Sequence, residues 1–286
     1  MKNIAIIVDS SAVLDPAIQN HPDVYTAHLT LSVEEQAYLD QLEFSHQQIL
    51  EALKEDKAMT SAMPSLGEIM RVYKEVDQKN YDHIFVLSVS SHVSGTHSGF
   101  VMVQEELKIK HLEVIDTYSI AGTVGYMTQV LLDLAQQDAT LEQMKLAIKQ
   151  IIDNTIVYIL PNNLERLVKS GRVHKAVGTL TNLLKLKVVL VFKNKGKQIE
   201  KWDITRTQKR ALSKIADALK QFGVTTKDWK LIILDIDETS PVAEMKAAIK
   251  EKFNDIEVLL QNLPSTLALH GGLGTIVIQA VKKVNY

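Results

Sequence analysis

The sequence predicts an α/β protein with a mainly parallel N-terminal sheet flanked by helices and a smaller C-terminal α/β domain. Short apolar runs alternate with longer amphipathic stretches, which is typical of parallel strands connected by helices. In the second half this alternation is interrupted by two strand-like runs that only a short turn separates. The length of 286 residues is sufficient for two domains. We therefore expect one domain over residues 1–161 and another over residues 162–286.

In the first domain, four short apolar runs bounded by polar or turn residues predict buried strands. Amphipathic stretches lie between them, and two serines, Ser45 and Ser65, stand where helix N-caps are expected. The predicted strands are Ile4–Val8, Ile84–Ser88, Leu112–Ile115 and Ile156–Leu160. The predicted helices are the one from Ser45 to about Lys54, Leu66–Val76, Ser94–Leu107, Ala121–Gln137 and Leu141–Ile152.

The second domain begins with two short helical stretches and continues with a hairpin. Its turn is the segment Asn194-Lys195-Gly196-Lys197, whose residue types favour a tight reversal. A helix follows, and a strand–helix–strand unit completes the domain. In order, the predicted elements are helices Leu164–Val168 and Leu180–Leu184, strands Val188–Phe192 and Gln198–Asp203, helix Gln208–Phe222, strand Leu231–Ile236, helix Val242–Phe253 and strand Ile256–Leu260.

Composition and charge narrow the possible functions. The 32 basic and 34 acidic residues give a formal net charge of −2. This balance argues against a general nucleic-acid binder, because neutralising phosphates requires clustered basic surface. The absence of cysteine excludes disulfides and thiolate chemistry. The N-terminal apolar run is too short for a signal peptide, and no apolar run approaches the ~20 residues of a membrane span. We expect a cytoplasmic protein.

Three segments combine small neutral donors with glycine or proline, next to an apolar run or the start of a helix. They are Thr60-Ser61-Ala62-Met63-Pro64-Ser65, Ser94-Gly95-Thr96 and His270-Gly271-Gly272-Leu273-Gly274. Glycine allows the backbone to approach a ligand, and the free N–H groups of a helix start favour an anion. No lysine lies in these segments, so we expect an anionic head group held by neutral donors. Serine N-caps and a structural histidine at a glycine turn are the alternatives.

Asp9 and Ser10 follow the first predicted strand, in the segment Asp9-Ser10-Ser11. Ligands collect at the carboxyl ends of the strands in an open parallel sheet. Asp9 therefore either faces a site there or, with Ser10, caps the next turn.

Several familiar catalytic patterns are missing or incomplete. The segment Gly95-Thr96-His97-Ser98-Gly99 resembles a hydrolase nucleophile elbow, but its serine is one residue out of place. The phosphate-binding loop that ends in Gly-Lys-Ser/Thr is absent, so we do not expect the chain to bind ATP by itself. The histidines lack the spacing of a zinc site, and we predict no metal and no cofactor.

One alternative function comes from Leu234-Asp235-Ile236-Asp237-Glu238-Thr239. An apolar strand followed by Asp-x-Asp-x-Thr resembles the first motif of haloacid dehalogenase-type phosphatases, in which Asp235 would be the nucleophile and Asp237 the general acid, with Mg²⁺. That chemistry also requires a downstream lysine and a further acidic pair, and Asp255 and Glu257 do not form a convincing one. The other interpretation is a strand end followed by a helix cap.

The order of these motifs along almost the whole chain resembles the DegV family. The matching segments are Asp9–Leu14, Thr60–Ser65, Ser94–Thr96, Val114–Thr117 with Gly122 and Gly125, Gly171-Arg172 and His270–Gly274. Two positions depart from the family pattern: Ser170 replaces a glycine, and Leu273 replaces a proline beside His270. Each motif alone is weak, whereas six motifs in order are specific.

The resemblance implies a two-domain protein that binds one long-chain fatty acid in an apolar tunnel between the domains. It would be a non-catalytic subunit that presents the carboxylate to an ATP-binding fatty acid kinase subunit. The resemblance implies that Ser61, Ser94 and His270 bind the carboxylate and that Arg206 contacts the kinase. Arg172 also lies beside the predicted site segments, and we expect it to contact the kinase, with a ligand contact or an ordinary surface arginine as the alternatives. Supporting positions would be Thr60, Gly95, Thr96, Asp9, Ser10, Gly272 and Gly274. It allows transient contact with a membrane surface during lipid exchange, and a lipid-sensing regulatory protein is a further alternative.

Overall fold

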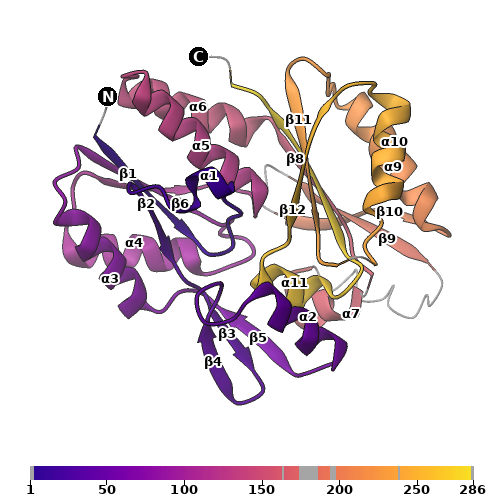
Figure 1. The fold of residues 1–286 in the computed structure, drawn as a ribbon, viewed down its shortest axis with the longest axis horizontal. Helices are drawn as coiled ribbons and strands as arrows, with labels where there is room; N and C mark the ends of the chain where they lie inside the picture. The colour runs from indigo at the N-terminus through magenta and orange to yellow at the C-terminus, as the bar shows by residue number, and fades with distance from the viewer. Residues whose placement is uncertain (1–2, 163, 174–185, 194–197, 238, 285–286) are drawn as a thin grey trace.

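Two α/β bodies lie side by side in the computed structural model, which describes residues 3–162, 164–173, 186–193, 198–237 and 239–284 (Figure 1). One contains a four-stranded sheet with the order β2-β1-β6-β7, and the other a six-stranded sheet with the order β10-β9-β8-β13-β11-β12. A small three-stranded sheet projects below the first body. The parallel N-terminal sheet and the α/β class agree with the prediction from the sequence.

The N-terminal sheet consists of β1 (Ile4–Asp9), β2 (Val24–Ala27), β6 (His83–Ser88) and β7 (Leu112–Asp116), and every neighbouring pair is parallel. Ala5 and Ile7 belong to the core cluster under α3 (Leu66–Asp77) and α4 (Thr96–Leu107). Ile4, Ile6 and Val8 point to the other face, which α5 (Gly122–Gln136) and α6 (Leu141–Asp153) cover. Both faces are buried, so the strands appear as continuous apolar runs.

The predicted N-caps are confirmed. The Ser65 hydroxyl accepts a hydrogen bond from the backbone N–H of Glu68 at the start of α3. Ser45 forms a reciprocal capping box with Gln48 at the start of α2 (His46–Lys54). Capping residues fix where a helix begins by local hydrogen bonds, which is why the sequence alone locates them.

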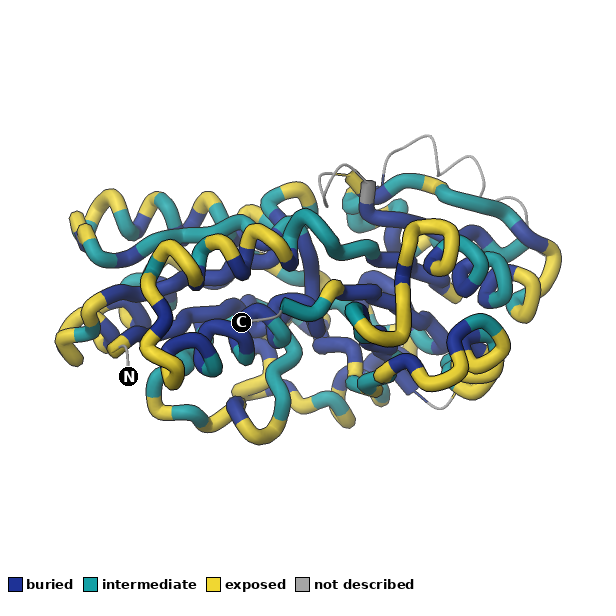
Figure 2. The backbone as a smooth tube through the Cα atoms, turned by 90° about the horizontal axis from the view of Figure 1, so that it is seen from above, coloured by how far each residue is buried: buried dark blue, intermediate teal, exposed yellow. Residues whose placement is uncertain are grey.

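The six-stranded sheet is mixed. Its strands are β8 (Thr155–Leu160), β9 (Lys187–Lys193), β10 (Gln198–Thr205), β11 (Trp229–Asp235), β12 (Glu257–Asn262) and β13 (Ile276–Lys282). The pair β11–β12 is parallel and the other described pairs are antiparallel. Helices α9 (Gln208–Gln221) and α10 (Val242–Lys252) cover one face, and α5 packs on the other. Helix α5 is thus enclosed between the two sheets, and dark blue buried backbone runs through the middle of Figure 2.

Some elements differ from the prediction. The predicted strand Ile156–Leu160 exists, but it pairs with β13 and β9 in the six-stranded sheet and not with the parallel one. The central strand β13 was not predicted. The change of sheet thus precedes β8, and the division at residues 161/162 remains a prediction. Leu180–Leu184 and the turn at 194–197 lie outside the described residues.

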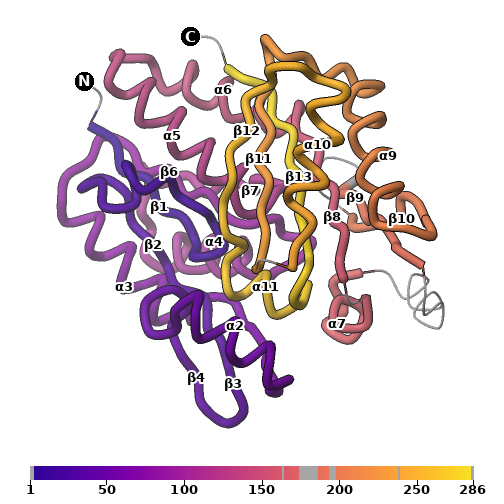
Figure 3. Tube along the Cα trace, turned by 45° about the vertical axis from the view of Figure 1, so that its right-hand side comes forward, coloured from indigo at the N-terminus to yellow at the C-terminus, as the bar shows by residue number. Residues whose placement is uncertain are grey.

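A small antiparallel sheet was also not predicted. It is formed by β3 (Thr30–Val33), β4 (Gln36–Leu39) and β5 (Met59–Ala62), with β3 in the middle. The described residues also include three short helices: α1 (Pro16–Gln19), α7 (Leu164–Lys169) and α11 (Ser265–Gly271). Figure 3 shows α11 at the lower ends of β11, β12 and β13, next to α2. Within the described residues, no helix has the length and apolarity that a bilayer crossing requires.

Gln279 of β13 connects the six-stranded sheet to the start of α5. Its side chain is fully buried, its Oε1 accepts from the backbone N–H of Thr123 at 3.0 Å, and its Nε2 donates to the carbonyl of Ile120 at 2.8 Å. A Cβ on Gly122 would lie 2.6 Å from Ile232, so only glycine allows α5 to approach the sheet this closely. One amide side chain therefore caps a helix that has no side-chain cap of its own.

Replacing Gln279 by leucine should lower the free energy of unfolding by about 3 kcal/mol, because two buried backbone groups lose their partner. Urea denaturation measures this change. Gln221→Leu, at the exposed end of α9, is the control and should change the free energy by less than about 0.5 kcal/mol. Equal effects of the two substitutions would contradict the role given to Gln279.

Candidate functional site

His270 lies in the last turn of α11 and faces β5. Its Nε2 is 2.9 Å from the Ser61 hydroxyl, and the ring is 9% exposed. Burial, and to a lesser extent the positive charge of Arg172, lowers the pKa of His270 to about 3. The ring is therefore neutral at physiological pH. Its buried Nδ1 has no hydrogen-bond partner within the described residues, so a bound group can satisfy it.

A narrow apolar cavity adjoins this ring, and we call it the His270 cavity. Its volume is about 50 Å³. Its polar lining groups are Arg172, His270 and Thr275. Apolar side chains from the start of α5, the six-stranded sheet, α7 and α11 form much of the wall, including Ile120, Ile159, Leu167, Phe192, Leu263 and Leu267. Drug-sized ligand sites usually measure about 300–1,000 Å³, so a long ligand requires the walls to separate.

Arg172 lies at this cavity rather than on an open surface. It donates from Nη1 to the Ser170 carbonyl at 2.8 Å and from Nε to the Val93 carbonyl at 3.4 Å. Partial burial lowers the pKa of its guanidinium. The sequence suggested that neutral donors alone would hold the head group, but the structure adds this positive charge beside His270. An anion in the cavity is consequently favoured.

The Ser94 loop lies next to the cavity through Val93, which is one of its lining residues. The Ser94 hydroxyl is 2.8 Å from that of Thr96 and accepts from the Thr96 backbone N–H at 3.3 Å. Gly95 stands at the N-cap of α4, and a Cβ there would lie 3.2 Å from the Met63 sulfur of the Thr60–Ser65 loop. The two hydroxyl loops thus pack together, while Thr60 is exposed and alternates with Ser61 along β5.

Asp237 holds the glycine loop that follows His270. Its Oδ1 accepts from the Gly274 backbone N–H at 3.0 Å, and the Thr239 hydroxyl donates to the same oxygen at 2.8 Å. Gly272 and Gly274 have φ angles of 76° and 77°, a region that favours glycine. Leu273, which stands where the family pattern has proline, packs against the main core. Asp237 therefore serves the loop, which is a structural role.

Asp9 and Ser10 lie at the carboxyl edge of the N-terminal sheet, where their side chains form hydrogen bonds with residues that follow other strands. Asp9 accepts from the Val89 backbone N–H at 2.6 Å and from Ser11, and burial raises its pKa. The Ser10 hydroxyl donates to Asp40 at 2.9 Å. Neither residue lines the His270 cavity. Their hydrogen bonds favour the turn-capping alternative.

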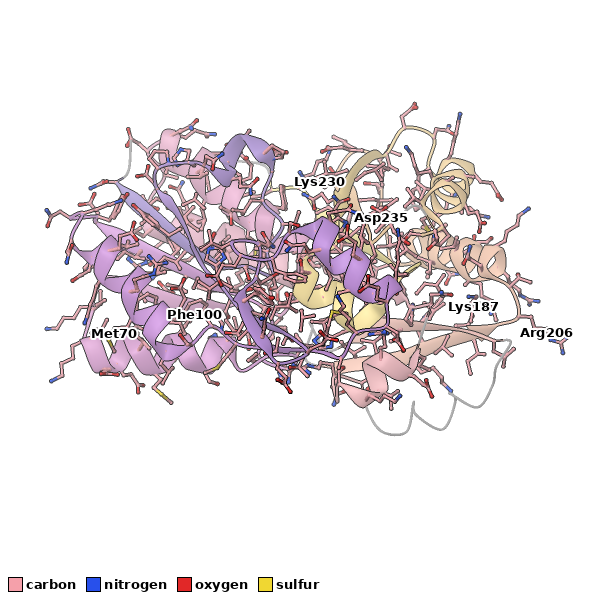
Figure 4. All side chains as sticks on the ribbon, turned by 60° about the horizontal axis from the view of Figure 1, so that its bottom comes forward. Met70, Phe100, Lys187, Arg206, Lys230 and Asp235 are labelled. Atoms are coloured by element: carbon pink, nitrogen blue, oxygen red, sulfur yellow. The ribbon has the colours of Figure 1, made fainter. Side chains whose placement is uncertain are left out.

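Arg206 lies at the same end of the six-stranded sheet as the glycine loop. It follows Thr205, which pairs with Lys187. Lys187 donates to the Asn162 side chain at 3.1 Å, and the Asn162 backbone N–H donates to Thr275 at 3.3 Å. The exposed Arg206 side chain points away from the protein in Figure 4. This position is accessible to a partner, whereas that of Arg172 is partly buried.

Sequence reasoning missed Asp40, Thr275 and the apolar lining. Thr275 directly follows the glycine loop and donates to the Gly271 carbonyl at 2.7 Å, so its position gave a usable signal. The apolar lining residues gave no such signal in the sequence, because nothing in their pattern distinguishes them from other residues of the hydrophobic core. In the part of the chain that the structure describes, no three His, Cys, Asp or Glu side chains gather in a way that could hold a metal ion.

Comparison with known proteins gives consistent matches. The family model of the DegV proteins, described as uncharacterised, matches residues 3–283. A DegV domain-containing protein of Lactococcus lactis, YqaC, is 24% identical over 275 residues, which cover 96% of each chain. A fatty acid-binding DegV family protein from Thermus thermophilus superposes with a TM-score of 0.88 at 25% identity, covering 98% of this chain and all of that one. The Streptococcus pneumoniae fatty acid kinase B3 protein loaded with linoleic acid superposes with a TM-score of 0.84 at 21% identity, covering 99% and 100%.

The low pKa of His270 has a consequence for stability. In the unfolded chain the ring titrates near pH 6.5, whereas the folded protein keeps it neutral until about pH 3. The unfolded state therefore binds the proton first, and stability falls below pH 6.5 by roughly 1.4 kcal/mol per pH unit. His270→Asn removes this loss. In urea denaturation at pH 7, 6 and 5, the free energy of unfolding of the variant should rise relative to that of the wild type as the pH falls. A difference between the two proteins that is the same at all three pH values would contradict the low pKa of His270.

Proposed function

This chain belongs to the DegV family, and we propose that it binds a single long-chain fatty acid and presents the carboxylate to a separate ATP-dependent kinase subunit. The observation that carries the proposal is the His270 cavity, which has apolar walls and three polar lining groups at Arg172, His270 and Thr275. The names of structural relatives, fatty acid binding and fatty acid kinase B3, point to the same ligand.

The acyl tail supplies the affinity. Each buried methylene contributes about 0.8 kcal/mol, so a sixteen-carbon tail offers roughly 12 kcal/mol as an upper bound. The apolar side chains that line the cavity belong to the same core cluster as the buried residues of α5 and α6, so widening the cavity would give the tail an apolar path. Part of the tail's energy is spent on separating these walls.

The polar groups orient the head of the ligand. We assign the carboxylate to Ser61, His270 and Ser94, with Arg172 as the nearby positive charge. A carboxylate is already a nucleophile toward a phosphoryl group, so phosphorylation needs positioning and no general base. A neutral His270 with a pKa of about 3 is suited to hydrogen bonding. The chain itself then has no catalytic group, and the kinase subunit provides the ATP site.

Two alternatives receive less support. Asp237 is occupied by Gly274 and Thr239, so no observation favours a phosphatase at Asp235 and Asp237. A lipid-sensing regulator would use the same cavity and differ in its protein partner. A cytoplasmic location and transient membrane contact for lipid exchange belong to the same proposal.

The purified protein should contain fatty acid, and His270→Ala should weaken its binding by about tenfold through loss of one hydrogen bond to a charged group. Organic extraction with mass spectrometry identifies the lipid, and titration of delipidated protein gives the affinity. His111→Ala, whose ring faces Asp77 at the other end of the N-terminal sheet, is the control. Finding no lipid, even after fatty acid is supplied, would refute the proposal.

Arg206→Glu should lower kinase-coupled turnover without changing fatty acid affinity, because the side chain is exposed and outside the cavity. Turnover at limiting kinase subunit, with affinity measured in parallel, separates the two effects. Lys220→Glu, on the last turn of α9, makes the same charge change at a control position. If Arg206→Glu and Lys220→Glu behave alike, Arg206 is not part of the kinase contact.

A further inference from the structure

Helix α11 carries His270 and forms one wall of the cavity, yet it has only seven residues. A helix this short is not stable alone, so contacts from outside must fix it. Thr266 and His270 are four residues apart and therefore lie on the same side of the helix. Both meet the N-terminal body: His270 contacts Ser61, and the Thr266 hydroxyl donates to Asp40 at 3.2 Å.

Asp40 is held firmly in the N-terminal body. It is fully buried directly after β4, and its backbone N–H donates to the Leu29 carbonyl at 2.9 Å. Its carbonyl is 2.7 Å from Nδ1 of His28. Its Oδ2 accepts from Ser10 as well as from Thr266, while Oδ1 has no partner in the described part of the chain. The carboxylate is therefore a fixed acceptor for the start of α11.

The spacing of the two contacts matches the small sheet. Strands β4 and β5 flank β3, and Thr30 of β3 pairs with Leu39 and Ala62. Asp40 comes one residue after Leu39 and Ser61 one residue before Ala62, so the two lie about 10 Å apart across the strands and about 7 Å apart along them, which gives about 12 Å in all. Thr266 and His270 are separated by about 6 Å along the helix axis, and the lengths of the four side chains span the remaining distance to Asp40 and Ser61.

We propose that Asp40 is a positioning residue: it fixes the start of α11 so that His270, at the end of the helix, meets Ser61 and the ligand carboxylate in one orientation. This inference rests on the proposed fatty acid binding. Asp40 would act on the site through α11 without touching the ligand, and it lies outside the family motifs recognised in the sequence.

The charge of Asp40 makes its role measurable. Burial raises its pKa to about 6, opposed chiefly by the hydrogen bonds from Ser10 and Thr266 and assisted by the nearby charge of Asp9. Two other titratable groups lie close to Asp40. The His28 ring contacts the backbone carbonyl of Asp40, and the Glu43 carboxylate accepts a hydrogen bond from the backbone N–H of Leu39. Hydrogen bonds to an ionised acceptor are about twice as strong as neutral ones. The contact with Thr266 is therefore tighter above pH 6 than below it.

The first test compares palmitate affinity of wild type and Asp40→Asn between pH 5.5 and 8. The variant should bind about fivefold more weakly at pH 7.5, and the difference should shrink to about twofold at pH 5.5, where most of Asp40 is protonated. Titration of palmitate itself is common to both proteins and cancels. Glu43→Gln, in the same loop, is the matched control and should follow the wild type. A wild-type-to-variant ratio that stays constant with pH would overturn the proposal.

A double-mutant cycle distinguishes positioning from a general structural role. In a His270→Ala background, Asp40→Asn should no longer weaken binding, because its effect is transmitted through His270. A fivefold loss in both backgrounds would refute this coupling. If Asp40→Asn does not fold, Thr266→Val removes the other partner of the same hydrogen bond and should give the same result.

A final measurement separates this inference from the proposed function. If the wild type binds no palmitate at any pH, fatty acid binding is wrong, but Asp40 can still be tested in the protein without ligand. The ¹⁵N resonances of the His270 ring should shift in Asp40→Asn and stay unchanged in Glu43→Gln. Unchanged His270 resonances in both variants would show that Asp40 does not position the ring.

Discussion

The hydrogen bond between Ser61 and His270 is the interaction on which the site depends. It joins residues that are 209 positions apart in sequence, one on a small sheet of the N-terminal body and one on a helix attached to the six-stranded sheet. The imidazole is buried and neutral, so the contact does not rely on an ion pair. The cavity, the glycine loop held by Asp237 and the hydroxyl loops are all arranged around this pair.

Much of the fold was predictable because its signals are local. Ser45 and Ser65 locate helix starts through hydrogen bonds within one turn, and the core strands of the N-terminal sheet are continuous apolar runs. The assignment of β8 to its sheet was not predictable in this way. It depends on β13, more than a hundred residues later, and an apolar run does not specify its partner. The strands β2 to β5 are short and partly exposed, so their pattern is weak.

The candidate site shows the same division. The motifs indicated Ser61 and His270, which the structure brings together. The sequence left open whether Arg172 contacts a ligand or a partner, and the packing of its loop against Val93 places it at the cavity. Asp9 and Ser10 were included because they end a parallel strand, yet hydrogen bonding joins them to neighbouring segments. Asp40 lies outside the recognised motifs, and its carboxylate accepts from Ser10 and Thr266, which are distant from it in sequence.

The narrowness of the His270 cavity has a consequence for how lipid would be exchanged. A permanently open apolar tunnel would expose sticky surface whenever the protein is empty, and such surface promotes aggregation. The His270 cavity has a volume of about 50 Å³, so its apolar walls lie close together in this conformation. Under the proposed function, the walls would have to separate before an acyl chain can enter, so the rate of uptake would level off as the lipid concentration rises. At high lipid concentration, the opening of the protein and not the encounter with lipid would then limit the rate of uptake.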